Sequence, residues 1–181
     1  EEREETTELP AKIWLFQGLP KSDKMELIIQ KAVELGAYQI VPVATKRAVV
    51  KLDKKKEEAK LKRWNAISES AAKQSKRLII PEIAPVMSFD EALAFVKDFD
   101  SRCIPYECAS GMDSVRQFVS QTGPGQKIAV FIGPEGGFEE IEIEKAREAG
   151  VVPVSLGKRI LRTETAGLAL LSVLAFHLEG G

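Results

Sequence analysis

Residues 131–138 have the composition of a ligand-binding loop. Their sequence, FIGPEGGF, follows the most strand-like run of the chain and precedes a helix-like segment. Gly133, Gly136 and Gly137 allow the backbone to approach a ligand closely, and Pro134 stiffens the turn. Open α/β sheets bind ligands at such junctions, so a binding loop is expected here, with a purely structural turn as the alternative. The segment matches neither a G-x-G-x-x-G fingerprint nor a P-loop.

A second segment, residues 156–166 with sequence LGKRILRTETA, also joins a strand-like run to a helix-like one. Two such loops on adjacent strands would face each other across one crevice. Gly157 permits close approach, and Arg162 is a permanent cation whose planar donors suit a carboxylate, a phosphate or a carbonyl edge. Thr163 and Glu164 also suit a helix cap and the helix dipole, so capping alone is the alternative for these two residues.

Other chemically interesting residues have structural explanations. His177 lies near the end of an apolar helix-like segment, which favours a packed or terminal histidine over a catalytic one. It is the only histidine, so a metal site built on two histidines is excluded. Cys103 and Cys108 have no partner set and are interpreted as core residues. Trp14 and Trp64 could stack on bases, but the helical spacing around Trp64 favours the core.

Strand-like and helix-like segments alternate along the chain and would position these loops. The alternation predicts an α/β fold with a parallel sheet and helices on both faces. Two helix starts carry a capping-box pattern, Asp23 with Glu26 and Ser88 with Glu91. The expected strands are residues 12–16, 38–43, 48–52, 78–80, 103–106, 126–132 and 151–155. The expected helices begin near residues 22, 57, 88, 113, 139 and 163.

The composition is that of a soluble globular domain. The chain has 181 residues, of which 44% are hydrophobic and 29% charged, and this excludes disordered and collagen-like classes. Two cysteines cannot form a disulfide framework, which favours the cytoplasm. The longest apolar run, residues 166–178, is too short to span a bilayer, and the acidic N-terminus has no signal-peptide core.

The net charge of -1 hides a strongly uneven distribution. Residues 46–77 contain twelve basic and four acidic residues, a local charge of +8, which acidic segments at 1–10, 78–101 and 138–150 offset. Such a block is typical of a protein that binds a polyanion, with a solvated lysine-rich helix as the alternative. The near-neutral total therefore does not exclude a nucleic-acid partner.

Four segments together resemble one known family. They are residues 22–36 (SDKMELIIQKAVELG), residues 71–77 (AAKQSKR), and the two loops at 132–138 and 156–166. These segments resemble the bacterial 16S rRNA uracil-N3 methyltransferases of the RsmE type, within the SPOUT superfamily. The resemblance covers about residues 12–178, and the two C-terminal loops are its most specific part.

The resemblance implies a SPOUT-like fold with a C-terminal trefoil knot, although unknotted connections are the general rule. It also implies S-adenosylmethionine (SAM) as methyl donor, a homodimer packed through the knot helices, and a single uridine of small-subunit (16S) rRNA as target. The implied donor-binding residues are Ile132, Gly133, Glu135, Gly136, Gly137, Leu156, Gly157, Ile160, Leu161, Arg162, Thr163 and Ala166.

The chemistry implied by this resemblance needs no metal, because the sulfonium methyl group is already activated. Uracil N3 must lose its proton, and Arg162 is expected to stabilise the charge that spreads onto the carbonyl oxygens. Glu135 or Glu164 is expected to accept the proton, directly or through water. Phosphate contacts are expected from the basic block, with these candidates: Arg47, Arg63, Lys73, Lys76 and Arg77.

The chain departs from the family pattern at two places. Members usually carry an N-terminal PUA-like barrel, so residues 1–11 are interpreted as an acidic linker or a remnant of it, before a methyltransferase domain at 12–181. Lys73 and Lys76 stand where an acid and a glycine are more usual, and both add positive charge. The alternatives are another SPOUT RNA methyltransferase and a non-catalytic RNA-binding or ribosome-assembly module. A flavodoxin-like or Rossmann nucleotide-binding domain would lack its fingerprint here.

Overall fold

The computed structural model describes residues 6–48, 52–106 and 111–180. Cys108 and most of the strand expected at residues 48–52 lie outside these ranges. Within them, none of the helices combines the length and apolar character needed to span a lipid bilayer.

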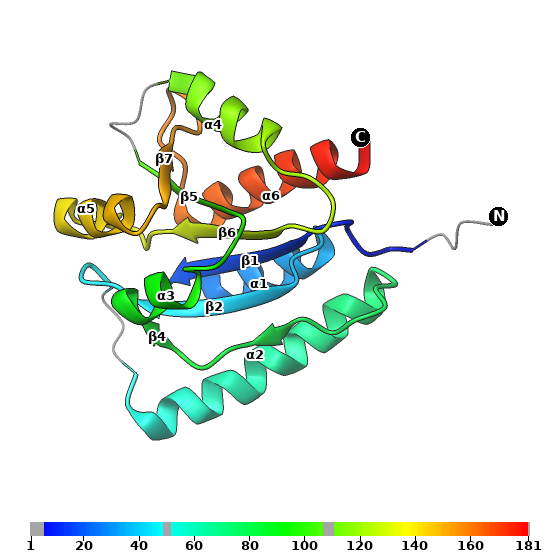
Figure 1. The fold of residues 1–181 in the computed structure, drawn as a ribbon. Coiled ribbons are helices and arrows are strands. Elements are labelled where there is room, and N and C mark those ends of the chain that lie inside the picture. Colours follow the sequence, from blue (N-terminus) through cyan, green and yellow to red (C-terminus); the bar gives the residue numbers. More distant parts are fainter. Residues whose placement is uncertain (1–5, 49–51, 107–110, 181) are drawn as a thin grey trace.

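A parallel sheet forms the centre of the molecule (Figure 1). Its strand order is β3-β2-β1-β6-β5-β7, with β4 pairing to β2, and every pairing is parallel. This arrangement confirms the predicted α/β fold with a parallel sheet. The strands are β1 (Lys12–Gly18), β2 (Gln39–Ala44), β3 (Glu82–Ile83), β4 (Met87–Ser88), β5 (Ser101–Pro105), β6 (Lys127–Ile132) and β7 (Val152–Val154).

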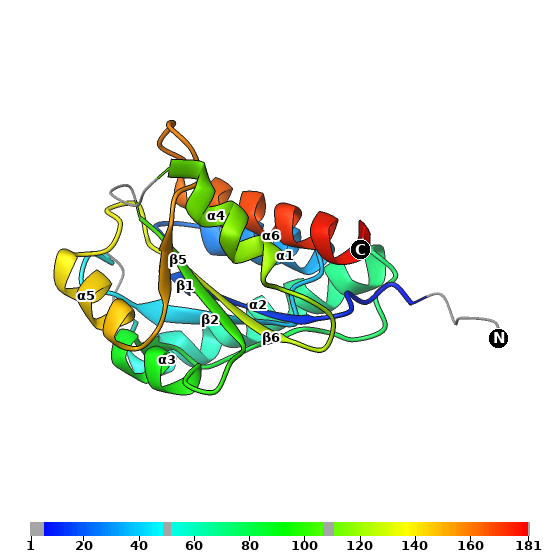
Figure 2. The same ribbon diagram turned by 45° about the horizontal axis from the view of Figure 1, so that its top comes forward.

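Helices cover both faces of the sheet, as Figure 2 shows. One face packs against α1 (Lys24–Glu34), α2 (Lys54–Gln74), α4 (Gly111–Ser120) and α6 (Thr163–Gly180). The other packs against α3 (Phe89–Phe95) and α5 (Glu140–Glu148). The central strands β1 and β6 are therefore buried on both sides, which explains why they read as continuous apolar runs rather than as an alternating pattern.

Two local predictions are wrong. Residues 78–80 form no strand: Leu78 is 72% exposed and Ile80 53% exposed. Pairing with β2 begins only after Pro81, at β3. The apolar character of residues 78–80 therefore does not reflect burial in the sheet.

The capping box expected at the start of α1 is also absent. Asp23 occupies the N-cap position but makes no side-chain cap hydrogen bond. Glu26, its expected partner, instead pairs with Arg63 of α2. The box at Ser88 and Glu91 is present and begins α3 as predicted.

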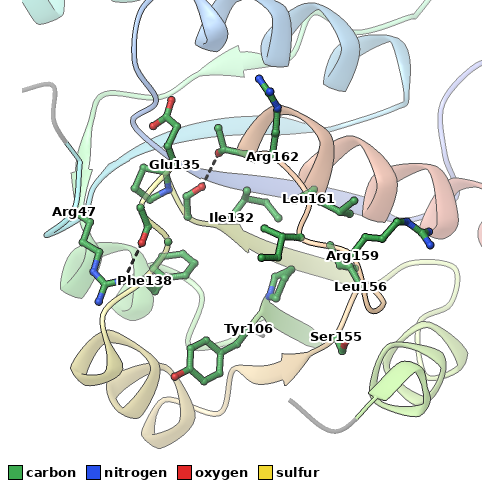
Figure 3. Close-up of a pocket in the computed structure, with 18 of the residues that line it drawn as sticks. Arg47, Tyr106, Ile132, Glu135, Phe138, Ser155, Leu156, Arg159, Leu161 and Arg162 are labelled. Carbon is green, nitrogen blue, oxygen red and sulfur yellow. Dashed lines mark hydrogen bonds between the residues drawn. The ribbon is translucent and has the colours of Figure 1, made fainter. Parts of the chain in front are cut away.

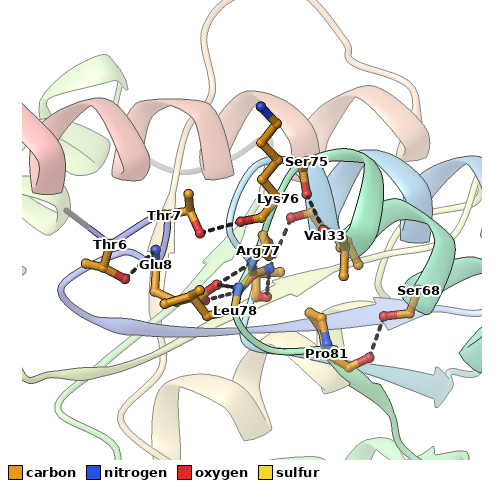
Figure 4. Close-up of polar contacts among 12 residues, drawn as sticks. Thr6, Thr7, Glu8, Val33, Ser68, Ser75, Lys76, Arg77, Leu78 and Pro81 are labelled. Atoms are coloured by element: carbon orange, nitrogen blue, oxygen red, sulfur yellow. Dashed lines mark hydrogen bonds and ion pairs between the residues drawn. The ribbon is translucent and has the colours of Figure 1, made fainter. Parts of the chain in front are cut away.

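The described part of the N-terminal segment packs against the domain (Figure 4). Glu8 forms an ion pair with Arg77, whose side chain is only 3% exposed and also donates to the carbonyl oxygens of Val33 and Ala37. Thr7 donates to the carbonyl oxygen of Lys76 at 2.8 Å. These bonds hold residues 7 and 8 against the ends of α1 and α2.

Candidate functional site

A cavity of about 670 Å³ opens where β5, β6 and β7 end (Figure 3). This volume lies within the range of about 300–1,000 Å³ that is usual for small-molecule sites. Both loops singled out from the sequence contribute to its wall. All twelve residues expected to bind the methyl donor line the cavity, together with Lys24, Arg47, Pro105, Tyr106, Pro134, Phe138, Glu140, Ser155 and Arg159.

The first loop takes its shape from its glycines. Gly137 has a φ of +74°, a conformation that side chains disfavour, and its N–H donates to the Pro134 carbonyl at 2.8 Å. A side chain at Gly133 would lie 3.1 Å from the Gly137 backbone. The tight turn leaves the backbone of this loop along one wall of the cavity.

Thr163 joins the two loops. It is the first residue of α6, and its hydroxyl donates to the carbonyl oxygen of Gly133 at 2.6 Å. The same hydroxyl accepts a hydrogen bond of 2.8 Å from Gln17. Gln17 is not among the site residues predicted from the sequence, and its one signal there is a glutamine at the end of an apolar run.

Lys24 connects three segments beside the cavity. Its Nζ lies 3.4 Å from Glu135 Oε1 and 3.8 Å from Glu164 Oε2. Burial raises the pKa of Glu135, but the N–H of Lys21, at 2.8 Å, and the ammonium group of Lys24 outweigh it and lower the pKa overall. Glu164 lies outside the set of lining residues and faces Lys24.

Arg162 and Arg159 belong to the cavity wall and are exposed. Within the described part of the chain, neither guanidinium group has an ion-pair or hydrogen-bond partner. In Figure 3 the Arg162 side chain points away from the cavity, so its expected catalytic role stays a prediction.

Arg47 brings the basic block to the cavity. It follows β2, donates to the Gly136 carbonyl at 2.8 Å and lines the cavity wall. From the sequence, Arg47 is expected only as a phosphate contact. A phosphate contact at Arg47 would therefore lie beside the first loop.

The other basic candidates lie on α2 or directly after it and have different surroundings. Arg63 pairs with Glu26, which raises its pKa. Lys73 lies 3.1 Å from Glu69 on the exposed face of α2, and Lys76 is exposed. The structure corrects the interpretation of Arg77 as a phosphate contact, because its buried guanidinium group is already bound to Glu8 and two backbone carbonyls.

The residues that the sequence assigned to structural roles have surroundings that fit those roles. His177 Nε2 lies 3.0 Å from the Thr122 carbonyl oxygen, at the end of α6. Burial strongly raises the pKa of the Cys103 thiol, which removes its nucleophilic form. Trp14 and Trp64 are 6% and 4% exposed and cannot stack on bases. In the described ranges, no cluster of three His, Cys, Asp or Glu side chains is arranged to hold a metal ion.

Comparisons with known proteins agree on one family. A family model described as an RNA methyltransferase domain matches residues 7–175. Ribosomal RNA small subunit methyltransferase E of Bacillus subtilis (strain 168) is 43% identical over 178 residues, covering 97% of this chain and 70% of that relative.

Solved structures show the same architecture. Ribosomal RNA small subunit methyltransferase E from Neisseria gonorrhoeae, bound to SAM, has a TM-score of 0.82 and 37% identity. A methyltransferase from Legionella pneumophila, in complex with SAM, has a TM-score of 0.86 and 38% identity. Each match covers 93% of this chain and 67% of the other.

Proposed function

Because the chain belongs to the RNA methyltransferase domain family, we propose that it transfers a methyl group from SAM to N3 of a uridine in small-subunit rRNA. The observation that carries this proposal is the cavity at the strand ends. Its two walls come from the loops at residues 132–138 and 156–166, and relatives of this fold hold SAM.

The cavity suits this donor in shape and chemistry. Ile132, Leu156 and Leu161 offer an apolar surface to an adenine ring, while Gly133 and Gly137 leave backbone at the wall. When bound, SAM supplies a methyl group already activated on a positively charged sulfur. The residues of the chain therefore need only to hold donor and acceptor in line and to favour a nucleophilic nitrogen.

The acceptor nitrogen sets the remaining demand on the protein. Uracil N3 carries an imide proton, and its loss leaves negative charge on the O2 and O4 atoms. Arg162 lines the cavity, and its exposed guanidinium group has no ion-pair or hydrogen-bond partner among the described residues, so it is free to turn toward the uracil and stabilise that charge. Glu135 and Glu164, which both face Lys24, are the candidates to accept the proton, directly or through water.

The rRNA lies along the basic block. Arg47 contacts phosphate at the cavity, and the exposed lysines of α2 extend the contact outward. Arg63, Lys73 and Lys76 remain candidate contacts on this surface.

We further propose a C-terminal trefoil knot, a homodimer packed through the knot helices, and a cytoplasmic location. The dimer is supported by α6, which exposes Val173 and Phe176, 48% and 82% respectively, in an otherwise apolar helix. Large apolar side chains grouped on one surface favour coverage by a partner.

Mass mapping of small-subunit rRNA tests the proposed reaction. The protein is incubated with SAM and either free rRNA or assembled small subunits. The RNA is then digested with a nuclease, and the masses of the fragments are measured by mass spectrometry. We expect one uridine-containing fragment to gain one methyl group, and reverse transcription to stop there because N3 methylation blocks base pairing. RNA binding without SAM binding in a calorimetric titration would instead indicate a non-catalytic module.

A further inference from the structure

Gln17 is a buried amide in a strand of apolar residues. It is 0% exposed, near the end of β1, and lies beside Ile132 in the β1–β6 register. Its Nε2 donates to the Gly18 carbonyl at 3.0 Å and to the Thr163 hydroxyl at 2.8 Å. The amide therefore lies directly beneath the junction of the two cavity loops.

These hydrogen bonds have only one consistent direction. The Thr163 hydroxyl has a single hydrogen, which it donates to the Gly133 carbonyl, so it must accept from Gln17. Exchanging the amide oxygen and nitrogen would set the oxygen against the Gly18 carbonyl. A directed chain thus runs from Gln17 through Thr163 to Gly133.

The stability of the core does not explain a glutamine at this position. Its Oε1 atom is buried and has no hydrogen-bond partner among the described residues. A buried acceptor without a partner costs stability, whereas a methionine would occupy similar space without that cost. A buried polar group that costs stability is often retained for function.

We propose that Gln17 is a positioning residue for the methyl-donor site and acts through the Thr163 hydroxyl. The proposal rests on the proposed function. Because β1 pairs with both β2 and β6, Gln17 stands on a rigid base and holds both loops at one point.

A second contact from the same strand end supports this role. Gly18 lies against Pro134, so closely that a side chain at residue 18 would come within 2.6 Å of the proline ring. The end of β1 therefore touches the first loop at Pro134 and, through Thr163, at Gly133. Both contacts precede ligand binding, which preorganises the wall that the donor meets.

A double-mutant cycle on donor affinity tests the proposal. SAM binding is measured by calorimetry for the wild type, Gln17→Met, Thr163→Val and the double variant. We expect each single variant to raise the Kd roughly tenfold, as for the loss of about one hydrogen bond. The double variant should match Thr163→Val, since Gln17 then has no hydroxyl to hold. An unchanged Kd for Gln17→Met, or independent effects that multiply, would overturn the proposal.

Controls separate positioning from stability. Ser68→Ala removes a buried side-chain hydrogen bond to the Pro81 carbonyl, far from the cavity. It should lower the unfolding temperature and leave the Kd unchanged, whereas Gln17→Met should raise the Kd while shifting the unfolding temperature by less than about 4 °C. Gln17→Leu replaces the methionine variant if the latter does not fold.

Hydrogen exchange provides a readout that needs no donor. In Gln17→Met without ligand, the Gly137 amide should exchange faster while the amides of β6 keep their protection. Equal exchange at Gly137 in both proteins would contradict the proposal. If the wild type binds no SAM, the proposed function fails, and this exchange measurement still decides the role of Gln17.

Discussion

Arginines of the same chain have quite different roles, and their partners decide which. Arg77 is buried and saturated by Glu8 and two carbonyls, so it holds the fold together. Arg47 donates a hydrogen bond to the Gly136 carbonyl oxygen at the cavity. Arg162 lines the cavity without a partner in the described part of the chain. A free guanidinium group is the one able to meet charge that develops on a substrate.

Replacing Arg162 with alanine tests its role in the reaction. We expect the single-turnover rate of methylation to fall about a hundredfold, because a cation is lost where charge develops. The Kd for SAM should change much less. Arg116→Ala, which removes an exposed arginine of α4 paired with Asp113, is the matched control and should leave the rate unchanged. A wild-type rate in Arg162→Ala would show that the residue has no catalytic role.

The ion pair at Glu8 predicts how stability depends on pH. Burial raises the pKa of this carboxyl, but Arg77 and the Leu78 N–H outweigh it, so the folded pKa lies below the ordinary value of 4.5. The carboxylate therefore stabilises the fold fully above pH 4.5, and this stability is lost as the pH falls through the lowered pKa.

Glu8→Gln should accordingly lower the free energy of unfolding at pH 7 by about 2 kcal/mol, because buried Arg77 keeps only a neutral partner. Urea denaturation at several pH values measures the effect, and the difference from the wild type should shrink below pH 4.5. Glu34→Gln, at the exposed pair with Lys31, is the control and should have an effect of less than about 1 kcal/mol. A difference that stays constant down to low pH would refute the assignment.

At the scale of elements, local patterns predicted most of the fold and both walls of the site. The alternation of apolar runs and capped helices located the central strands, and the two glycine-containing loops fell at strand ends where parallel sheets bind ligands. Both patterns are local in sequence, so they can be recognised without knowledge of tertiary contacts.

Contacts between distant residues could not be predicted in this way. Arg77 is bound by Glu8, 69 residues away, and Gln17 by Thr163, 146 residues away. Composition marks Arg77 as one more member of a basic block, and only the fold reveals that it is buried. The strand prediction for residues 78–80 was wrong for a related reason, since apolar side chains alone do not show which segment pairs with a neighbouring strand.

Helix α2 carries the largest group of exposed lysines, and this predicts the salt dependence of RNA binding. Changing Lys55, Lys60 and Lys62 to glutamine should weaken binding and reduce the slope of log K against log salt by about 2, since each phosphate contact releases a counterion. Fluorescence anisotropy over a range of salt concentrations measures the slope. Changing Lys31, Lys97 and Lys145 to glutamine removes the same amount of charge outside α2. This control should leave the slope of log K against log salt unchanged. Equal slopes in wild type and α2 variant would exclude α2 as the RNA surface.

For the whole molecule, α6 presents a conflict between composition and surroundings. Apolar residues occur all round this helix, a pattern typical of helices enclosed on every side. Leu170, Leu171 and Leu174 are buried against the sheet, but Val173 and Phe176 point outward. A second copy of the chain covering this face would resolve the conflict and would place the C-terminal helices of two subunits together.

Phe176→Asp tests this arrangement, because a carboxylate at the centre of an apolar interface would remain unpaired. The wild type should sediment at twice the 19.9 kDa of one chain and the variant at that mass. The Kd for SAM should rise in the variant if the partner subunit completes the cavity wall. Leu78→Asp changes a side chain that is 72% exposed on a different segment and should remain a dimer with unchanged donor affinity. A monomeric wild type that binds SAM as tightly as expected would show that one chain completes the site alone, and that the exposed face of α6 has another purpose.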